Sequence, residues 1–67
     1  MMTLSEHIKL KRKLNGLSQV ELAERAGVGL RFVRDLEQGK QTLRMDKVND
    51  VLALFDEYLG PVKTDNV

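Results

Sequence analysis

Apolar residues recur at helical spacing in four stretches of this chain, and residues that start or stop helices separate the stretches. The first stretch carries an apolar stripe made of Leu4, Ile8, Leu10 and Leu14. Before it, Thr3 and Glu6 have the spacing of a capping box, in which each side chain accepts from the other's backbone amide. After it, Asn15-Gly16 can adopt the left-handed conformation that ends a helix. The pattern predicts a first helix between Thr3 and Asn15.

The second stretch predicts a short helix that begins after Ser18. Ser18 and Glu21 repeat the capping-box spacing, and Leu17 before them can fall back into the core. The inner face of this helix is predicted from Val20, Leu22, Ala23 and Ala26. Gly27 follows, where the chain must reverse in a conformation that costs other residues about 1 kcal/mol or more. We therefore expect a tight turn at Gly27, with Val28 tucked inward beside it.

A third helix is predicted after this turn, with Gly29 as its N-cap. Val33 and Leu36 are spaced to point back at the second helix. Two short helices around a glycine turn are the outline of a helix-turn-helix that reads DNA. Because Arg31 and Arg34 would then lie on the side away from the core, this helix is shaped to enter a major groove.

The fourth stretch predicts a last helix from a Thr42 cap to about Phe55, after Gln38-Gly39 has closed the third. The positions spaced for burial are Leu43, Val48, Val51, Leu52 and Phe55. Together the stretches predict an all-α domain of four to five short helices over residues 1–55, with the helix-turn-helix at its centre.

Residues 56–67 form a separate C-terminal segment. Residues 56–62 are too few and too interrupted for an amphipathic helix, and we expect a short strand there. A single strand has no partner in a helical chain, so it would pair with its copy in a second subunit. Pro61 limits such a ladder because proline cannot donate to it. The alternative, of equal weight, is an extended segment lying over the core, and we expect disorder over residues 63–67.

Length and composition narrow the class of protein. At 67 residues the chain forms one small domain with a modest core, which a partner subunit would help to stabilise. It has no cysteine, which excludes a disulfide framework, a thiolate metal site and a zinc finger, and favours the cytoplasm. No segment approaches the roughly 20 apolar residues of a membrane helix. We therefore expect a soluble protein that is neither secreted nor membrane-bound.

Charge is distributed unevenly along the chain, although the net charge is only +1. Over residues 7–44, nine basic residues stand against four acidic ones, whereas from residue 45 onward two basic residues stand against five acidic ones. A basic front and an acidic back fit a domain that presents one side to phosphates. A solvated charged surface is the plainer alternative.

Two motifs closely resemble the Cro and phage-repressor type of helix-turn-helix, often called the XRE family. They are Leu17-Ser-Gln-x-Glu-Leu-Ala-x-x-Ala-Gly-Val and Val33-x-x-Leu-Glu-Gln-Gly-Lys40. The similarity covers roughly residues 8–55 and implies a lambda-repressor-like fold. Within the family, the compact length and the stretch from residue 42 to a strand-like end look most similar to HipB-type antitoxins.

The resemblance also implies a set of DNA contacts. Gln19, which opens the second helix, matches the family glutamine that touches a phosphate and braces the recognition helix. The outward face of the third helix, where relatives place base and backbone contacts, is formed by Leu30, Arg31, Arg34 and Asp35. Lys40 matches a basic residue that approaches phosphate, and Arg44 would add attraction that does not depend on sequence. Arg12 and Glu37 match a buried ion pair that ties the first helix to the end of the third in some relatives.

The chain departs from the family pattern at three places. Gly29 stands where a serine or threonine often caps the recognition helix, so its phosphate contact must come from the backbone amide alone. Leu30 and Phe32 are apolar at positions that are commonly polar, and they would pack on a thymine methyl or a sugar, or equally within the protein or against a partner. Pro61 interrupts the terminal strand, which weakens the likeness to an antitoxin dimer.

Arg31 is the first candidate for direct base readout. A guanidinium can bond both major-groove acceptors of guanine, and Arg34 is the second candidate for this role. Asp35 would be repelled by phosphates unless it accepts from a cytosine amino group or holds a neighbouring arginine. It follows Arg31 by four residues, so an intrahelical pair worth about 0.2 to 0.5 kcal/mol is our preferred interpretation.

No residues with catalytic or metal-binding spacing are found in the sequence. His7 is the single histidine and is interpreted as a partly exposed helix residue. Nothing resembles a nucleophile with its base or a phosphate-cradling glycine loop, and so short a chain could hardly enclose a substrate pocket. We expect no enzymatic activity, no metal and no cofactor.

The sequence favours a repressor that binds duplex DNA as a homodimer. The third helix of each subunit would enter successive major grooves of an inverted-repeat operator. The leading elaboration is an antitoxin that represses its own operon and also docks a toxin. The alternatives are a phage- or plasmid-type repressor without a toxin, and a protein-interaction module that kept the fold.

Overall fold

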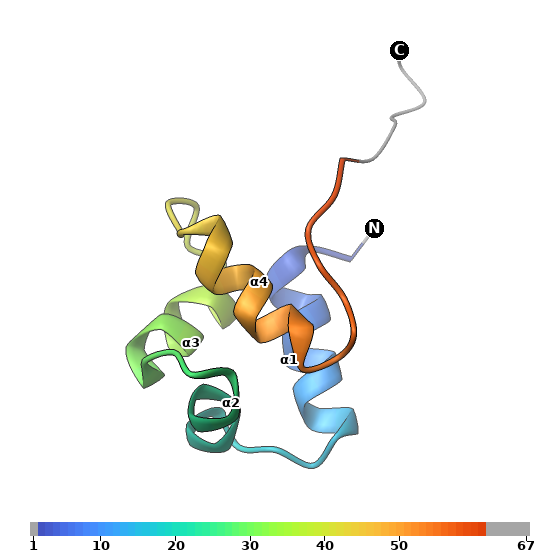
Figure 1. The fold of residues 1–67 in the computed structure, drawn as a ribbon, viewed down its shortest axis with the longest axis vertical. Coiled ribbons are helices and arrows are strands. Elements are labelled where there is room, and N and C mark those ends of the chain that lie inside the picture. The colour runs from blue at the N-terminus through green and yellow to red at the C-terminus, as the bar shows by residue number, and fades with distance from the viewer. Residues whose placement is uncertain (1, 62–67) are drawn as a thin grey trace.

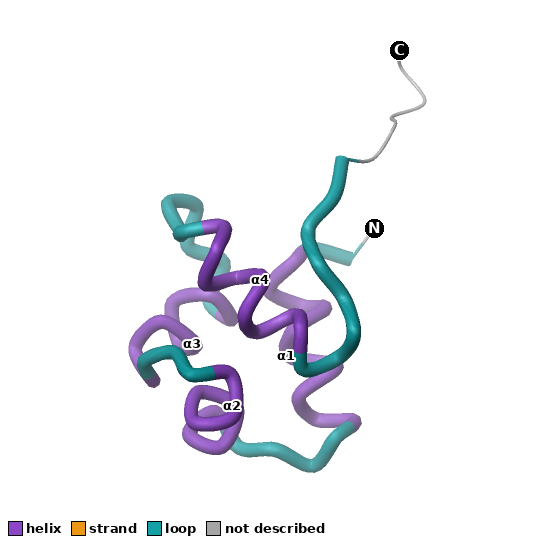
Figure 2. Tube along the Cα trace, viewed as in Figure 1, coloured by secondary structure: helices purple, strands orange, loops and turns teal. Residues whose placement is uncertain are grey.

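Four α-helices account for most of residues 2–61, the part of the chain that this computed structural model describes (Figure 1). They are α1 (Leu4–Leu14), α2 (Gln19–Ala26), α3 (Leu30–Glu37) and α4 (Met45–Ala53). Figure 2 shows loops and turns everywhere else in this range. The described part is thus all-helical, as predicted, and none of its helices is long and apolar enough to cross a membrane.

Both capping boxes predicted from the sequence are formed. At the start of α1, the Thr3 hydroxyl accepts from the Glu6 amide at 3.2 Å, and the Glu6 carboxylate accepts from the Thr3 amide at 3.1 Å. Ser18 and Glu21 repeat this arrangement at the start of α2, with distances of 3.1 and 2.9 Å. The hydrogen bonds lower the pKa of both glutamates. Each box satisfies two backbone amides that a helix start leaves without partners.

A single apolar core lies between the four helices. Its buried members are Ile8, Leu17, Leu22, Ala23, Val33, Leu36, Val48, Val51 and Leu52. Through them, α3 packs against both α1 and α2, and α4 packs against α2. Leu17 is buried as predicted, and Val28 packs partly against the core beside the turn. The helix-turn-helix is therefore held from two sides, by α1 and by α4.

The apolar stripes predicted for α1 and α2 are wrong in part. Leu10 is 42 % exposed and Leu14 is 71 % exposed, so Ile8 is the one buried residue of α1. Successive helical residues are rotated by about 100°, which places Leu10 roughly 200° from Ile8 around the axis. The inner face continues instead one turn after Ile8, at Arg12. Val20, on α2, is 47 % exposed for the same reason, because it lies two residues before the buried Leu22.

The start of α4 also differs from the prediction. The helix begins at Met45 with Arg44 as its N-cap, so the predicted cap at Thr42 is wrong. Leu43 packs partly against the core from the preceding loop, and the chain becomes helical only after this anchor. Asp46 then lies in the first turn, where the positive end of the helix dipole stabilises a carboxylate. A core anchor, rather than a threonine cap, thus sets where α4 begins.

Gly27 makes the turn between α2 and α3 in the left-handed conformation. Its φ and ψ are 72° and 31°, and its amide donates to the carbonyl groups of Ala23 and Glu24. The Val28 amide donates to the Ala23 carbonyl at 3.0 Å, which closes the end of α2. This turn sets the angle at which α3 leaves α2.

Replacing Gly27 with alanine should destabilise the domain by about 1 kcal/mol, because an L-residue is strained in this conformation. A Cβ there would meet no atom within 4 Å, so the loss comes from backbone strain and not from a steric clash. Urea unfolding of Gly27→Ala measures the loss. Gly60→Ala is the matched control, since Gly60 also has open space around it but no positive φ. Equal stability of the two variants would contradict this account of the turn.

Residues 57–61 run as an extended segment over the core and contain no strand, so the predicted strand is not supported. Leu59 packs against the core, and its amide donates to the Asn49 side chain at 2.7 Å. The Glu57 amide donates to the Leu52 carbonyl at 3.1 Å, and His7 Nε2 lies 2.7 Å from Glu57 Oε1. Two backbone amides that a ladder could use, those of Glu57 and Leu59, are therefore engaged by residues of α4. The predicted disorder over residues 63–67 lies outside the described residues.

Candidate nucleic-acid interface

The outward face of α3 carries a stripe of long polar side chains. Val33 and Leu36 point inward and are 0 % and 1 % exposed, whereas Arg31, Arg34 and Gln38 are exposed. These three follow one another at helical spacing, three and then four residues apart. Figure 1 shows α3 at one edge of the molecule. We call Arg31, Arg34 and Gln38 the outward stripe.

Gln38 is the member of this stripe that the sequence analysis missed. Because Gln38 precedes Gly39, it was interpreted as the end of the third helix, and it is the C-cap of α3. It lies seven residues after Arg31, which is close to two helical turns and therefore on the same side. Glutamine can bond adenine in a bidentate manner in the major groove. Helical spacing from Arg31 was the signal that could have identified it.

Leu30 and Phe32 are half-buried against the core. Phe32 also lies under the Lys47 ammonium group, which is 6.0 Å from the ring centroid. An ammonium at this distance over an aromatic face is a favourable contact. The apolar character of these two positions thus serves packing between α3, the core and α4. Only part of Leu30 is left for contact with a duplex.

Gly29 is the N-cap of α3, as predicted, and it makes no side-chain capping bond. Its φ of −73° and ψ of 152° are ordinary extended values, so no strain holds glycine here. The amides of the first turn of α3 consequently have no side-chain acceptor at the cap. Helix N-termini in this condition suit a phosphate oxygen.

A buried ion pair holds the end of α3 against α1. Arg12 donates from Nε to Glu37 Oε2 at 2.7 Å and from Nη2 to Glu37 Oε1 at 2.9 Å. Arg12 Nη1 donates to the Leu17 carbonyl at 2.9 Å, and the side-chain amide Nε2 of Gln19 donates to Glu37 Oε1 at 3.2 Å, so Gln19 braces the end of α3. Glu37 is 5 % exposed. This network ties α1, the start of α2 and the end of α3 together, and so fixes the direction of the outward stripe.

The network also sets the charge state of Glu37. Burial raises the pKa of this carboxyl, but the hydrogen bonds from Arg12 and Gln19 and the attraction of Arg12 outweigh it, and the net pKa is lowered. The Glu37 carboxylate in turn raises the pKa of Arg12. Both members therefore stay charged in the folded protein at neutral pH.

Acid should destabilise the fold through Glu37. A folded-state pKa below the ordinary value gives stability above the unfolded pKa, and this stability is lost as pH falls through the folded pKa. We expect Glu37→Gln to be less stable than the parent protein at neutral pH. Between about pH 5 and pH 3, the variant should lose less of its free energy of unfolding than the parent does. Urea midpoints across this range measure both effects, with the exposed Glu24→Gln as control. A pH profile parallel to that of the parent would contradict the role of Glu37.

Two of the expected phosphate contacts are paired with carboxylates. Lys40 Nζ lies 3.6 Å from Asp35 Oδ2, and Arg44 Nη2 lies 2.6 Å from Asp46 Oδ2. The predicted intrahelical pair of Asp35 with Arg31 is therefore wrong. The Lys40 amide bonds the Asp35 carbonyl at 3.1 Å, which brings the lysine back beside the last turn of α3. Within residues 2–61 Arg31 makes no ion pair, and it stays exposed on the outward stripe.

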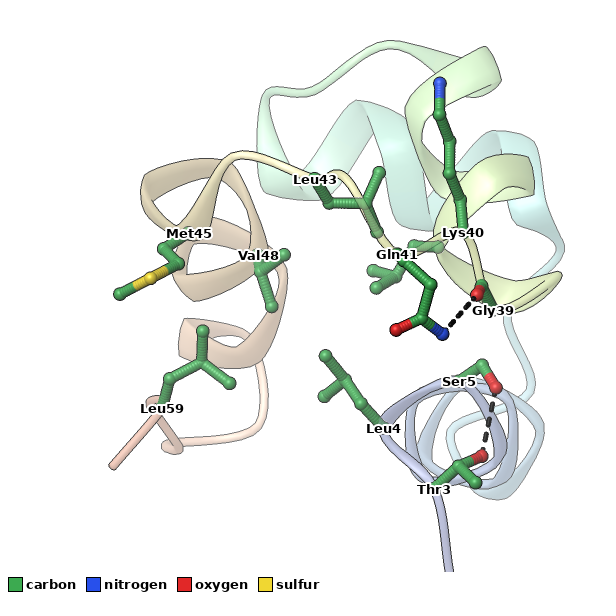
Figure 3. Close-up of a pocket in the computed structure, with 11 residues that line it drawn as sticks. Thr3, Leu4, Ser5, Gly39, Lys40, Gln41, Leu43, Met45, Val48 and Leu59 are labelled. Atoms are coloured by element: carbon green, nitrogen blue, oxygen red, sulfur yellow. Dashed lines mark hydrogen bonds between the residues drawn. The ribbon is translucent and has the colours of Figure 1, made fainter. Parts of the chain in front are cut away.

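Two open hollows lie beside α1. The smaller, of about 270 Å³, lies between α1, the loop after α3, and α4. Figure 3 shows Leu4, Leu43, Val48 and Leu59 around its apolar side, while Lys40 extends away from it. The larger, of about 430 Å³, includes His7 and Glu57. Within residues 2–61, no three histidine or acidic side chains are grouped so as to hold a metal ion.

Comparison with known families places this geometry in context. Residues 8–60 match the helix-turn-helix family of XRE type, which covers more than half of the chain. The chain therefore belongs to this family of DNA-binding regulators, which confirms the resemblance based on the two motifs.

One curated relative is similar over about two thirds of this chain. It is an uncharacterized HTH-type transcriptional regulator, y4mF, of Sinorhizobium fredii, and it is 53 % identical over 45 residues. The aligned part covers 67 % of this chain and 59 % of the relative, so the chain matches somewhat over half of that protein. The finer likeness to HipB-type antitoxins stays a prediction.

Proposed function

We propose that this protein binds duplex DNA at a specific sequence through the outward stripe of α3. The observation that carries the proposal is the exposure of Arg31 and Arg34 on a helix whose end is fixed by the buried Arg12–Glu37 pair. A guanidinium on a rigid helix loses little conformational freedom when it bonds a guanine edge. The backbone amides of the first turn of α3, after Gly29, would contact one phosphate. The cations Lys40 and Arg44 would contact phosphates near the other end of α3. Gln19, at the start of α2, would contact a further phosphate.

The protein would act as a homodimer on an inverted repeat. One α3 of eight residues reaches only a few base pairs, so a single copy reads too short a site for selective binding. Two copies with their α3 helices about 34 Å apart would enter successive major grooves on one side of the duplex. A second subunit would also add buried apolar surface to a small core.

The bound dimer would repress transcription by occluding the operator. The acidic back and the C-terminal segment are then available for a second partner, which supports an antitoxin that represses its own operon and docks a toxin. A phage- or plasmid-type repressor without a toxin is the simpler form of the same proposal. In either form the protein would work in the cytoplasm, without catalysis and without a cofactor.

Selection of bound duplexes from a random pool, at two salt concentrations, tests the proposal. The expected result is enrichment of an inverted repeat with half-sites about one helical turn apart. Sedimentation should then show two protein copies bound to one duplex. Enrichment should fail for the Arg31→Ala/Arg34→Ala double variant. If the parent protein enriches no sequence, the fold serves protein interaction instead. Co-purification with the product of an adjacent gene decides whether a toxin partner exists.

A further inference from the structure

Arg44 is held by a carboxylate of its own helix. Arg44 Nε donates to Asp46 Oδ1 at 3.1 Å, and Arg44 Nη2 donates to Asp46 Oδ2 at 2.6 Å. This two-bond arrangement uses the same guanidinium edge that would grip a phosphate. The bonds from Arg44 lower the pKa of Asp46, so the carboxylate is charged at neutral pH. In the free protein, Arg44 thus has an anionic partner already.

Lys40 is in a similar but looser contact. Its ammonium lies 3.6 Å from Asp35, on the last turn of α3. Lys40 and Arg44 are the two cations of the loop between α3 and α4, and each has an aspartate beside it. The same arrangement at both positions means that this loop exposes far less net positive charge than its basic residues alone would give.

We propose that Asp46, and more weakly Asp35, are positioning residues that compete with phosphate for Arg44 and Lys40. Duplex binding then exchanges a carboxylate for a phosphate at each cation. The inference rests on the proposed function and deepens it, because it names side chains that limit how strongly the backbone of any DNA attracts the protein.

The exposure of the Arg44–Asp46 pair makes this exchange feasible. The two side chains are 70 % and 62 % exposed, so both remain hydrated and the pair can open at small cost. A phosphate must displace the Asp46 carboxylate from Arg44, and this exchange cancels part of the attraction between Arg44 and the phosphate. Backbone attraction is reduced for every duplex, and a stable complex then depends on the base contacts of Arg31 and Arg34.

A double-mutant cycle with Asp46→Asn, Arg44→Gln and the combined variant tests the proposal. The measured quantity is the affinity for a random-sequence duplex at several salt concentrations. We expect Asp46→Asn to bind about threefold more tightly at low salt, with a log–log salt slope steeper by up to about one. In the Arg44→Gln background the gain should vanish, because Asp46 acts through Arg44. Thermal melting of each variant checks that the fold is kept.

Asp50→Asn is the matched control. Asp50 lies on α4, is exposed and has no ion-pair partner within residues 2–61, and the substitution removes the same charge. A gain in Asp50→Asn as large as in Asp46→Asn would overturn the proposal, as would a gain that persists without Arg44. Either result leaves the proposed function intact if the parent protein still selects an operator. Failure of the parent to bind any duplex would overturn both.

Discussion

Arg31→Ala is expected to weaken binding to the selected operator by about 5- to 150-fold per subunit, which corresponds to roughly 1 to 3 kcal/mol for one bidentate contact with guanine. The same substitution should change affinity for random duplex only by the small factor due to one lost charge. The difference arises because a base contact exists only at the matching sequence, whereas phosphate attraction is present everywhere.

Titrations with operator and random duplexes, at one fixed salt concentration, measure both quantities. Arg25→Ala is the control, because Arg25 is an exposed arginine on α2 outside the outward stripe. Operators with single base changes should show that base preference is relaxed at one or two positions in each half-site. Equal losses on operator and random duplexes would refute the assignment of Arg31 to base readout.

Arg12→Met is expected to destabilise the domain by about 3 to 5 kcal/mol, because it leaves the buried Glu37 carboxylate without its cation. The variant also removes the bond to the Leu17 carbonyl, which lies between α1 and α2. For a domain of this size, such a loss is a large share of the total stability. DNA binding should decline with it, since the end of α3 is no longer fixed.

Urea unfolding at neutral pH measures the effect of Arg12→Met. Lys13→Met removes the neighbouring but exposed base and should change stability by less than about 0.5 kcal/mol. A loss below about 1 kcal/mol in Arg12→Met would show that the ion pair is not a principal support of the fold.

Local signals predicted the starts of α1 and α2 and the turn at Gly27 well. The Thr3 and Ser18 boxes and the left-handed Gly27 depend on neighbours within four residues, and each is formed in the structure. Such features are decided by backbone hydrogen bonds close in sequence, so the residue types at those positions carry most of the information. The family resemblance supplied the pairing of Arg12 with Glu37, which lie 25 residues apart.

The errors at α4 and at Asp35 arose where the path of the chain after a helix decides the outcome. The start of α4 follows from where Leu43 meets the core, and a threonine at residue 42 carries no information about that. Asp35 pairs with Lys40 and not with Arg31, because the chain turns at Gly39 and brings the lysine back beside α3. Local spacing could not distinguish Lys40 from Arg31 as its partner.

The C-terminal segment shows the same limitation. Its extended conformation was one of two predicted alternatives, and a strand was the other. The extended conformation is supported by the Asn49 side chain, which lies ten residues earlier in the chain and accepts a hydrogen bond from the Leu59 amide. Helical periodicity in α4 gave no sign that a polar residue there would bond the following segment.

The central claim is that the outward stripe of α3 touches the bases, and an NMR titration of the labelled protein with its selected duplex tests this most directly. The account predicts that the side-chain Nε–Hε signals of Arg31 and Arg34 shift on binding, together with the amide of Gly29, while the amide of Leu59 stays in place. Saturation with duplex while both arginine signals remain at their free positions would contradict it.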